Sequence, residues 1–419
     1  MLLENESYPS DCRVLLQAES LVAAGYRVAV ICPTNTKSTR KAETIGDVRV
    51  YRYPHPPHIS GLFGYAFEFG YSILMQFLIS LYVFVRHGFD AIHMHTPPDM
   101  NAVTPAFFKL LGKKFVYDLH DLSPELYQAQ RDGEGSRLIH GLLLRFERFA
   151  SRTANVLIAT NETQRDVQIH RCGANASKCF VVRNGPNEAF MQRVVPKPEL
   201  RKPGCLNIGY VGVIGVQDGV DYLVRAVHAL VTERMRTDLQ VIIVGSGPAL
   251  EDLKTLVHSL HLDDFFLFTG MIPFVEVPKH IAAFDVCSTP DPSNSYNDSC
   301  TTIKTMEYMA LGKPVVCFET SENMKTAGQS ALYASNNDIS QYAGLLEKLM
   351  DDAELRSEMG QIGRQRVENG LTWDHQAAQL VKAYDGLFGV SRQTDHDLLH
   401  GASINSSIAH LSKADRISN

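Results

Sequence analysis

Residues 297–317 read NDSCTTIKTMEYMALGKPVVC, and the rest of the chain is best interpreted outward from this run. The pattern predicts a polar loop, a short helix and a buried strand. Ser299, Thr301 and Thr302 are residue types that cap helix N-termini, and Gly312 suits the position just past a helix end. The helix N-terminus should face the polar loop, where its unpaired N–H groups and partial positive charge favour an anion.

Lys304 and Glu307 lie three residues apart on this helix and therefore share one face. The ammonium group suits a phosphate, and the carboxylate suits a pair of hydroxyl groups. The alternative is a plain surface ion pair, which contributes only about 0.2–0.5 kcal/mol. The spacing alone leaves both interpretations open.

Length and composition narrow the class of protein. The 419 residues are enough for two or three domains, and a formal net charge of −6 argues against a general nucleic-acid binder. Eight cysteines without a CxxC pair predict a reducing, cytoplasmic location rather than a disulfide scaffold or zinc site. The first residues have no signal-peptide pattern, and the apolar run 1–3 is short for an opening strand, so we expect a missing residue or two.

Strand and helix patterns alternate along the chain in two series. They predict an α/β protein with doubly wound domains at 1–195 and 206–372, joined by a Pro- and Lys-rich linker at 196–205. Residues 373–389 predict a helix that returns to the N-terminal domain, and residues 390–419 predict a disordered tail. Ligands bind at the carboxyl ends of parallel strands, so we expect a cleft between the two domains.

Residues 61–85 are apolar, with Glu68 as their only formal charge. Gln76 is the only strongly polar side chain from 69 to 85. The length is borderline for a membrane span, which needs about 20 apolar residues. Three interpretations stay open: a buried helix on a sheet, an interfacial helix on a membrane, and a span, which continuous strand patterns on both sides disfavour.

Two predicted strands carry histidines near their ends. His93 and His95 alternate onto one face of their strand. Without a third ligand nearby, we favour one core histidine and one histidine at the strand end over two metal ligands. His120 follows the next strand, at the carboxyl end where ligands are expected. Its alternative role is a loop histidine held by Asp118 or Asp121.

The order of elements and the opening motif resemble the retaining GT-B glycosyltransferases of the GT4 type (glycosyl transferases group 1), over about residues 4–388. The most specific match is the run 304–316, which is similar to the family's donor-site helix. Further features fall where the family has similar ones: Asn184-Gly185, the Gly212 loop, Gly245-x-Gly247-Pro248, His120-Asp121 and Trp373.

The resemblance implies a nucleotide-sugar donor bound mainly by the C-terminal domain and a glycan or lipid-linked acceptor on the N-terminal one. Glu307 would hold the ribose hydroxyls, amides near Gly212 and the helix after residues 297–302 would meet the diphosphate, and His120 would lie beside the sugar. The family retains anomeric configuration and needs no metal, and the chain has no convincing DxD motif. The implied catalytic residues are His120 and Lys304, and the implied donor-binding residues are Asn184, Gly212, Val213, Gly245, Asp298, Ser299, Thr301 and Glu307.

Three positions depart from the family pattern. Ser299 stands where a second glutamate is common, and Val213 and Asp218 stand where the loop often carries an Arg and a Lys. Two missing cations matter because the charge of the leaving diphosphate must be stabilised. Lys304 is the best replacement for them, and Asp298 is a candidate for the sugar-hydroxyl contact.

We therefore expect a cytoplasmic, metal-independent glycosyltransferase that builds a surface polysaccharide or a lipid-linked intermediate, with peripheral membrane contact through residues 61–85. Two alternatives stay open. The departures at Val213, Asp218 and Ser299 also fit a non-catalytic nucleotide-sugar-binding scaffold subunit. A third candidate is another GT-B enzyme, such as a nucleotide-sugar epimerase. The sequence identifies neither the donor sugar, the acceptor nor the oligomeric state.

Overall fold

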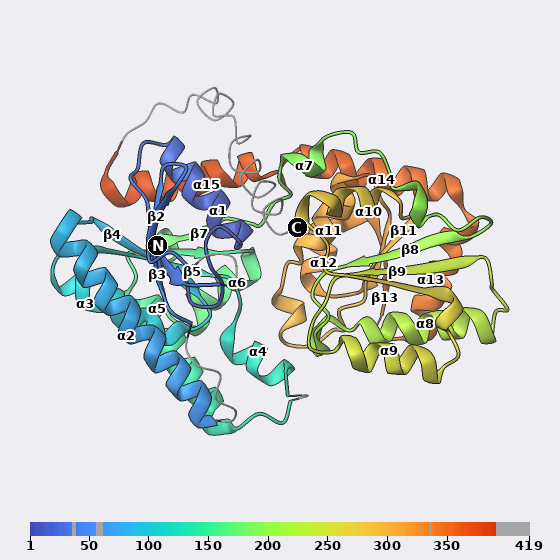
Figure 1. Cartoon of the computed structure of the whole chain (residues 1–419), viewed down its shortest axis with the longest axis horizontal. Coiled ribbons are helices and arrows are strands. Elements are labelled where there is room, and N and C mark those ends of the chain that lie inside the picture. The colour runs from blue at the N-terminus through green and yellow to red at the C-terminus, as the bar shows by residue number, and fades with distance from the viewer. Residues whose placement is uncertain (36–38, 56–61, 132, 336, 391–419) are drawn as a thin grey trace. The chain divides into compact units, whose positions relative to one another are not determined.

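The computed structural model of the chain contains two compact α/β units (Figure 1). The first unit comprises Met1–Arg183 and the described residues from Asp374 onward, and the second comprises Asn184–Trp373. Each has a mainly parallel sheet with helices packed on it, so the predicted fold class of two Rossmann-like domains is confirmed. The described residues are 1–35, 39–55, 62–131, 133–335 and 337–390.

The sheet of the first unit has two parts, in the orders β2-β3-β1 and β4-β5-β6-β7. Leu2 joins them, because it pairs in parallel with both Ile31 and Met94. This single bridging residue takes the place of the opening strand expected from residues 1–3. The pairs are parallel except β2 with β3. The strands are β1 (Ala29–Pro33), β2 (Ala42–Ile45), β3 (Val48–Tyr53), β4 (Ala91–Thr96), β5 (Lys114–Leu119), β6 (Val156–Ala159) and β7 (Cys179–Val181).

The helices of the first unit include the last one of the described chain. In that helix, Tyr384 Oη lies 2.9 Å from His93 Nδ1, and Asp385 accepts a hydrogen bond from Tyr26 Oη at 2.8 Å. The predicted tail lies outside the described residues from 391 onward. The helices are α1 (Cys12–Ala23), α2 (Leu62–His87), α3 (Val103–Leu110), α4 (Ser123–Ala129), α5 (Arg137–Thr153), α6 (Glu162–Asp166) and α15 (Trp373–Phe388).

The sheet of the second unit is fully parallel, in the order β10-β9-β8-β11-β12-β13. The chain order reverses between β8 and β11, and ligands of doubly wound folds bind beyond the strand ends at such a switch point. The loops after β8 and β11 therefore define where a site is expected. The strands are β8 (Leu206–Val211), β9 (Leu239–Val244), β10 (Phe266–Gly270), β11 (Val286–Thr289), β12 (Val315–Phe318) and β13 (Ala331–Ala334).

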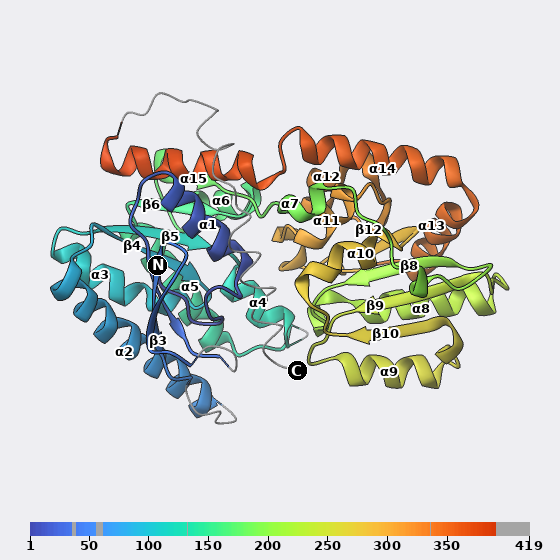
Figure 2. The same ribbon diagram turned by 45° about the horizontal axis from the view of Figure 1, so that its top comes forward.

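Helices cover both faces of this second sheet (Figure 2). Two apolar cores lie between the sheet and these helices. Leu223 of α8 and Leu346 of α13 belong to one core. Tyr308 and Met309 of α11 belong to the other, which fixes the motif helix against the strands. The helices are α7 (Glu188–Met191), α8 (Val220–Thr232), α9 (Leu250–Ser259), α10 (Val277–Ala282), α11 (Ile303–Ala310), α12 (Ser321–Ala327), α13 (Ile339–Asp351) and α14 (Ala353–Glu368).

The boundary between the units falls at residue 183 and not at 195, so the prediction was wrong there. Phe190 and Leu200 are buried in a core of the second unit. The predicted linker also packs on that unit, since Lys197 pairs with Glu276 at 3.0 Å and the Leu200 carbonyl accepts from Asn207 Nδ2 at 3.1 Å. Proline and lysine are common in linkers, but here they cover a sheet.

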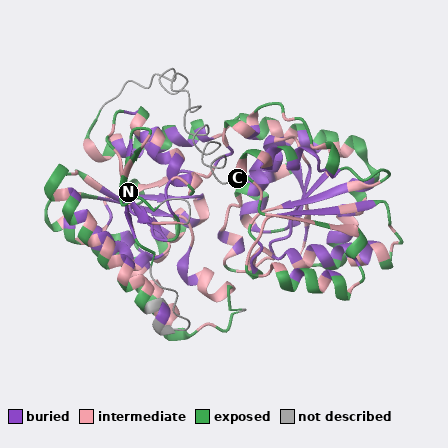
Figure 3. Ribbon diagram, in the orientation of Figure 1, coloured by how far each residue is buried: buried purple, intermediate pink, exposed green. Residues whose placement is uncertain are grey.

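Helix α2 is only partly covered by the first unit. Its segment Phe67–His87 is, among the described residues, the one helix long and apolar enough to cross a membrane, and 22% of that segment's most apolar window is buried. The buried-helix interpretation is therefore wrong for most of its surface, which Figure 3 shows as exposed or half-buried.

Candidate active site

The loops that follow β8 and β9 pack directly on each other at the carboxyl edge of the second sheet. Gly212 N–H donates to the Val244 carbonyl at 3.0 Å, and Ile214 N–H donates to the Ser246 carbonyl at 3.1 Å. A Cβ on Gly245, whose φ is +135°, would lie 1.9 Å from the Gly212 carbonyl oxygen. Close backbone packing therefore explains this glycine. The Gly212 amide is committed within the protein, so a diphosphate contact would fall to its neighbours.

Val213 is exposed at the tip of the β8 loop, and its side chain offers no charge. Its carbonyl accepts a hydrogen bond from Tyr210 Oη at 2.6 Å, which holds the backbone in place. Among the described residues no acceptor is found for its N–H. This amide is thus available to an anionic ligand, although the arginine common in the family at this position is missing.

Lys304 is buried between two carboxylates, each from a different loop. Its Nζ lies 3.0 Å from Asp291 Oδ1, after β11, and 3.2 Å from Asp218 Oδ1, after β8. It also lies 3.4 Å from Tyr210 Oη and over the ring of that tyrosine. The residue is 8% exposed, and among the described ion pairs none joins it to Glu307. The surface ion-pair interpretation is therefore wrong.

The two carboxylates keep the Lys304 ammonium charged. Burial alone would lower the pKa of Lys304, but Asp291, Tyr210 and Asp218 outweigh it and raise the pKa well above its usual value. Burial raises the pKa of Asp291, and Lys304 opposes that rise. Two carboxylates pair with one ammonium group, so the positive charge of Lys304 is largely neutralised inside the protein before any ligand binds.

Glu307 lies one turn further along α11 and is 7% exposed. Burial raises the pKa of Glu307 to about 8. No hydrogen-bond partner for its carboxyl group is found in the described part of the chain. Its carboxyl oxygens are not among the fully enclosed atoms without a partner, so hydrogen-bond donors from outside the protein can reach them. This side chain is therefore the clearest sign of a ligand in the second unit.

The polar side chains before α11 are already engaged in the loop. Asp298 accepts from Ser293 Oγ at 3.0 Å, and burial raises the pKa of Asp298. Ser299 Oγ donates to the Tyr296 carbonyl at 2.7 Å, and Thr301 donates to a carboxylate oxygen of α12 at 3.0 Å. These contacts shape the loop, and a role in donor binding would have to use the remaining lone pairs.

The motif helix begins as predicted at Ile303, with Thr302 as the residue before it, but without the predicted cap. The Thr302 hydroxyl pairs with that of Thr305 at 2.9 Å, and no side-chain capping bond is found there. Gly312 follows the helix end with a φ of +67°. Asn184 is the first residue of the second unit. It is half-buried and already interacts with other residues of the protein.

In the first unit, His120 is held by Asp118 at the end of β5. His120 Nε2 lies 3.2 Å from Asp118 Oδ2 and 3.1 Å from His95 Nδ1. The His120 side chain keeps 18% of its surface exposed. Asp118 therefore fixes the ring, as the alternative interpretation proposed, and part of that ring stays exposed to solvent.

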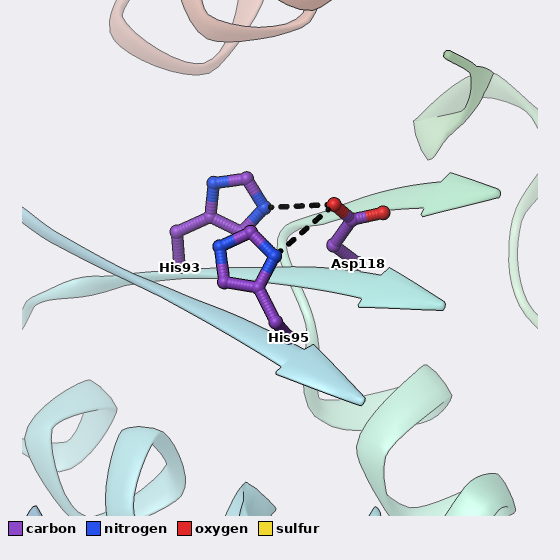
Figure 4. A group of neighbouring side chains, drawn as sticks. All are labelled: His93, His95 and Asp118. Atoms are coloured by element: carbon purple, nitrogen blue, oxygen red, sulfur yellow. Dashed lines mark ion pairs between the residues drawn. The ribbon is translucent and has the colours of Figure 1, made fainter. Parts of the chain in front are cut away.

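Asp118 lies at the centre of a buried polar network (Figure 4). His93 Nε2 and His95 Nδ1 lie 3.6 and 3.3 Å from Asp118 Oδ2, a grouping whose ligand atoms are close enough for a metal. However, Arg13 donates two hydrogen bonds to Asp118, at 2.8 and 3.2 Å, and Gln17 donates a third at 2.7 Å. A metal would have to displace or face this guanidinium, so the donor set fits a hydrogen-bonded network better than a metal centre.

The charges in this network are fixed by the same contacts. Burial opposes ionisation of Asp118, but Arg13 and His120 outweigh it and hold its pKa well below the usual range. Burial lowers the pKa of His93 and of His95, so both rings stay neutral. An ionised carboxylate paired with one guanidinium thus orients His120.

Comparison with protein families follows the division of the chain. The model described as "Glycosyl transferase 4-like domain" matches residues 12–185, and "Glycosyl transferases group 1" matches residues 205–352. The chain belongs to the GT4-type GT-B glycosyltransferases. A 2-deoxystreptamine glucosyltransferase of Streptomyces kanamyceticus is 25% identical to this glycosyltransferase over 402 residues, which is 91% of this chain and 99% of that one.

Solved structures agree with this family's fold. Sucrose-phosphate synthase from Thermosynechococcus elongatus superposes with a TM-score of 0.73 at 19% identity, covering 92% of this chain and 95% of that one. The Anabaena protein HepE, solved with UDP and glucose, gives a TM-score of 0.67 at 16% identity over 92% of this chain and 98% of its own. At these identities the likeness concerns the fold of the glycosyltransferase.

Two partners at these sites were missed from the sequence. Asp291 follows the buried strand β11 at the switch point, where a polar residue after a buried run was the available signal. Arg13 lies in α1, among apolar neighbours, and is 8% exposed. No local pattern connects Arg13 with Asp118, because their contact spans 105 residues of sequence.

Glu307→Gln should separate stability from ligand binding. In the folded protein the pKa of Glu307 is about 8 against 4.5 when unperturbed, so the folded state keeps a proton that the unfolded chain releases. Glu307 therefore costs stability that grows as pH rises from about 4.5 to about 8. We expect Glu307→Gln to raise the free energy of unfolding at pH 8 by about 1–3 kcal/mol, measured with urea, and to abolish nucleotide binding.

Glu322→Gln is the matched control. Glu322 is fully buried, but it accepts from Lys325 at 2.9 Å and Thr301 at 3.0 Å. Its substitution should lower stability. A loss of stability in Glu307→Gln as well would show that Glu307 has a structural partner.

Gly245→Ala should disturb the β8 loop. The new Cβ would meet the Gly212 carbonyl at 1.9 Å, whereas in Gly270→Ala it would meet nothing within 4 Å. Both positions have a positive φ, +135° at Gly245 and +70° at Gly270, so both variants are strained, and Gly245→Ala adds the clash and a less tolerated φ. We expect Gly245→Ala to lose about 1–3 kcal/mol more in urea unfolding than Gly270→Ala, and to bind nucleotide more weakly. Equal losses would contradict the loop packing.

Proposed function

We propose that this glycosyltransferase moves a sugar from a nucleotide-sugar donor to a glycan or lipid-linked acceptor, with retention of configuration and without a metal. The observation that carries the proposal is Glu307, a buried carboxyl group without a partner on the motif helix. Two hydroxyl donors of a ribose would satisfy it. Supporting this donor class, HepE of the same fold was solved with UDP and with UDP-glucose.

Different residues of the chain would contact different parts of the donor. Glu307 would hold the ribose, and the Val213 amide together with the N-terminus of α11 would meet the diphosphate. His120, oriented by Asp118, would lie beside the transferred sugar. In a front-face step the bond from the anomeric carbon to the diphosphate breaks, the acceptor oxygen bonds on the same face, and its proton passes to the leaving phosphate.

The departure at Asp218 supports a specific role for Lys304. The family often carries a loop lysine where this chain has Asp218, and Lys304 Nζ lies 3.2 Å from that carboxylate. The Lys304 ammonium therefore lies next to the β8 loop, although Lys304 itself belongs to α11. We propose that it supplies the positive charge that the loop has lost, with Asp291 holding it in place.

A second candidate is a non-catalytic nucleotide-sugar-binding subunit. It is favoured by the charge count around Lys304, whose two carboxylate neighbours leave little net positive charge for a leaving diphosphate. A nucleotide-sugar epimerase is the third candidate. The proposed location of all three is cytoplasmic, where nucleotide sugars are available.

A donor screen is the first test. UDP-, GDP- and ADP-sugars should each be added to the full chain in a thermal-unfolding assay. The correct donor at a hundredfold excess over Kd should stabilise by about 2.7 kcal/mol. Turnover with that donor should continue in EDTA, and NMR should show a product with the donor's anomeric configuration.

The other outcomes assign the alternatives. Activity lost in EDTA and restored by a divalent cation would contradict metal independence. Binding without turnover over many acceptors would identify the scaffold, and isomerised donor without an acceptor would identify an epimerase.

The exchange of charge can be tested by reversing it. Lys304→Met leaves Asp218 and Asp291 unpaired, so it should cost about 3–5 kcal/mol of stability as well as turnover. In the double variant Asp218→Lys, Lys304→Met, the lysine returns to the family's loop position beside Asp291. We expect it to recover most of the stability and part of kcat.

Lys313→Met is the matched control. Lys313 is half-buried and donates to the carbonyls of Ala282 and Phe284 at 2.8 and 2.6 Å. It should lose stability with kcat retained. If the double variant regains stability but no turnover, Lys304 does not replace the loop lysine.

A further inference from the structure

The polarity of α2 is the reverse of that in a helix on a soluble protein. Its few polar side chains in the segment from residue 69 to 85 face inward: Ser72, Gln76 and Ser80 are each at most 1% exposed. Gln76 donates to the Leu3 carbonyl at 2.9 Å, and Ser72 donates to a carboxylate oxygen of Glu4 at 3.1 Å. The outward side therefore contains only apolar residues and glycine over this segment.

The exposed residues of α2 form one stripe. Most of them are three, four or seven positions apart, and Leu81 and Tyr82 are adjacent, so at 3.6 residues per turn all of them lie on one side of the helix. Val85, at the C-terminal end, is 79% exposed. At about 1.5 Å per residue the stripe is about 28 Å long. Its exposed large side chains are Phe67, Leu74, Leu78, Leu81, Tyr82 and Val85.

The stripe continues onto the neighbouring helix α3. Phe77 of α2 packs edge-on against Phe107 of α3, with ring centroids 5.1 Å apart, and Figures 1 and 2 both show the two helices side by side. Leu110 is 85% exposed. Single exposed leucines are ordinary, but a continuous apolar surface on two helices indicates a binding surface. The exposed members from α3 and its end are Val103, Phe107, Leu110 and Leu111.

Cations gather at one end of this apolar surface. Arg86 and Lys114 are exposed, and Lys113 is half-buried, with its ammonium 5.4 Å from the ring centroid of Phe84. Asp90 is the exposed acid within this group. Long basic side chains at the edge of an apolar surface suit a membrane interface, where their stems lie in the apolar layer and their charges reach anionic headgroups.

We propose that the α2–α3 face docks on an anionic lipid bilayer, with α2 lying in the plane of the interface. The inward hydrogen bonds of Gln76 and Ser72 keep α2 on its own sheet, which opposes a helix that leaves the unit to cross the bilayer. The inference does not rest on the donor reaction, although a lipid-linked acceptor would be met at such a surface.

Vesicle sedimentation of the full chain tests the proposal. The protein should pellet with vesicles of phosphatidylcholine and phosphatidylglycerol, and less with phosphatidylcholine alone. In Leu78→Glu, Tyr82→Glu two charges enter the apolar stripe, so binding should fall by at least about tenfold. Both side chains are about half exposed, and Tyr82 also packs edge-on against Tyr51, so the melting temperature should fall only slightly, and donor turnover on a soluble acceptor should be retained.

Met271→Glu is the control, because Met271 is 78% exposed and belongs to the second unit. It should bind vesicles like the unchanged protein. High salt should weaken binding by screening the cations. The proposal is overturned if the protein stays in the supernatant, or if the double variant binds equally. It is also overturned if carbonate fails to release the protein, as for a span, or if the stripe only mediates dimers in sedimentation velocity.

Discussion

The geometry of the second unit's site depends on the ion pairs that the Lys304 ammonium makes with two carboxylates. This ammonium joins three elements that sequence separates, namely the loop after β8, the loop after β11 and the helix α11, through Asp218 and Asp291. In low-dielectric surroundings such a group is stable only while its partners remain. The same contacts reduce the charge that Lys304 can offer a ligand. A cationic replacement and a structural tie are therefore competing uses of one side chain.

The first unit also contains a buried charged group, the carboxylate of Asp118. Arg13 from α1 and Gln17 satisfy the carboxylate, and the remaining contact orients His120 at the end of β5. Each unit thus has a buried group of paired charges near the carboxyl edge of its sheet, and these contacts hold neighbouring groups in place. Because burial favours neutral histidine here, His93 and His95 complete the packing without adding charge.

The sequence predicted the parts of this arrangement that depend on local pattern. Alternating strands and helices gave the fold class, and the run 297–317 gave the motif helix and its ends. The prediction failed where contacts between residues far apart in the sequence determine the structure. The pairing of Lys304 with Asp291 needed the strand order, and the pairing of Arg13 with Asp118 spans 105 residues. The domain boundary failed for the same reason, since Phe190 and Leu200 pack on a sheet that begins after them.

The composition of helix α2 alone does not decide whether the helix is buried, interfacial or membrane-spanning. An apolar run of this length fits a buried helix or an interfacial helix, and it is borderline for a span. The distinction comes from where three polar side chains lie. Ser72, Gln76 and Ser80 face the sheet together with apolar residues such as Val83, whereas the exposed side of the helix carries large apolar side chains and no charge between residues 69 and 85. An outward apolar face has no advantage in water, whereas the inward hydrogen bonds oppose full insertion. The proposed position at a lipid–water interface would satisfy both sides of the helix.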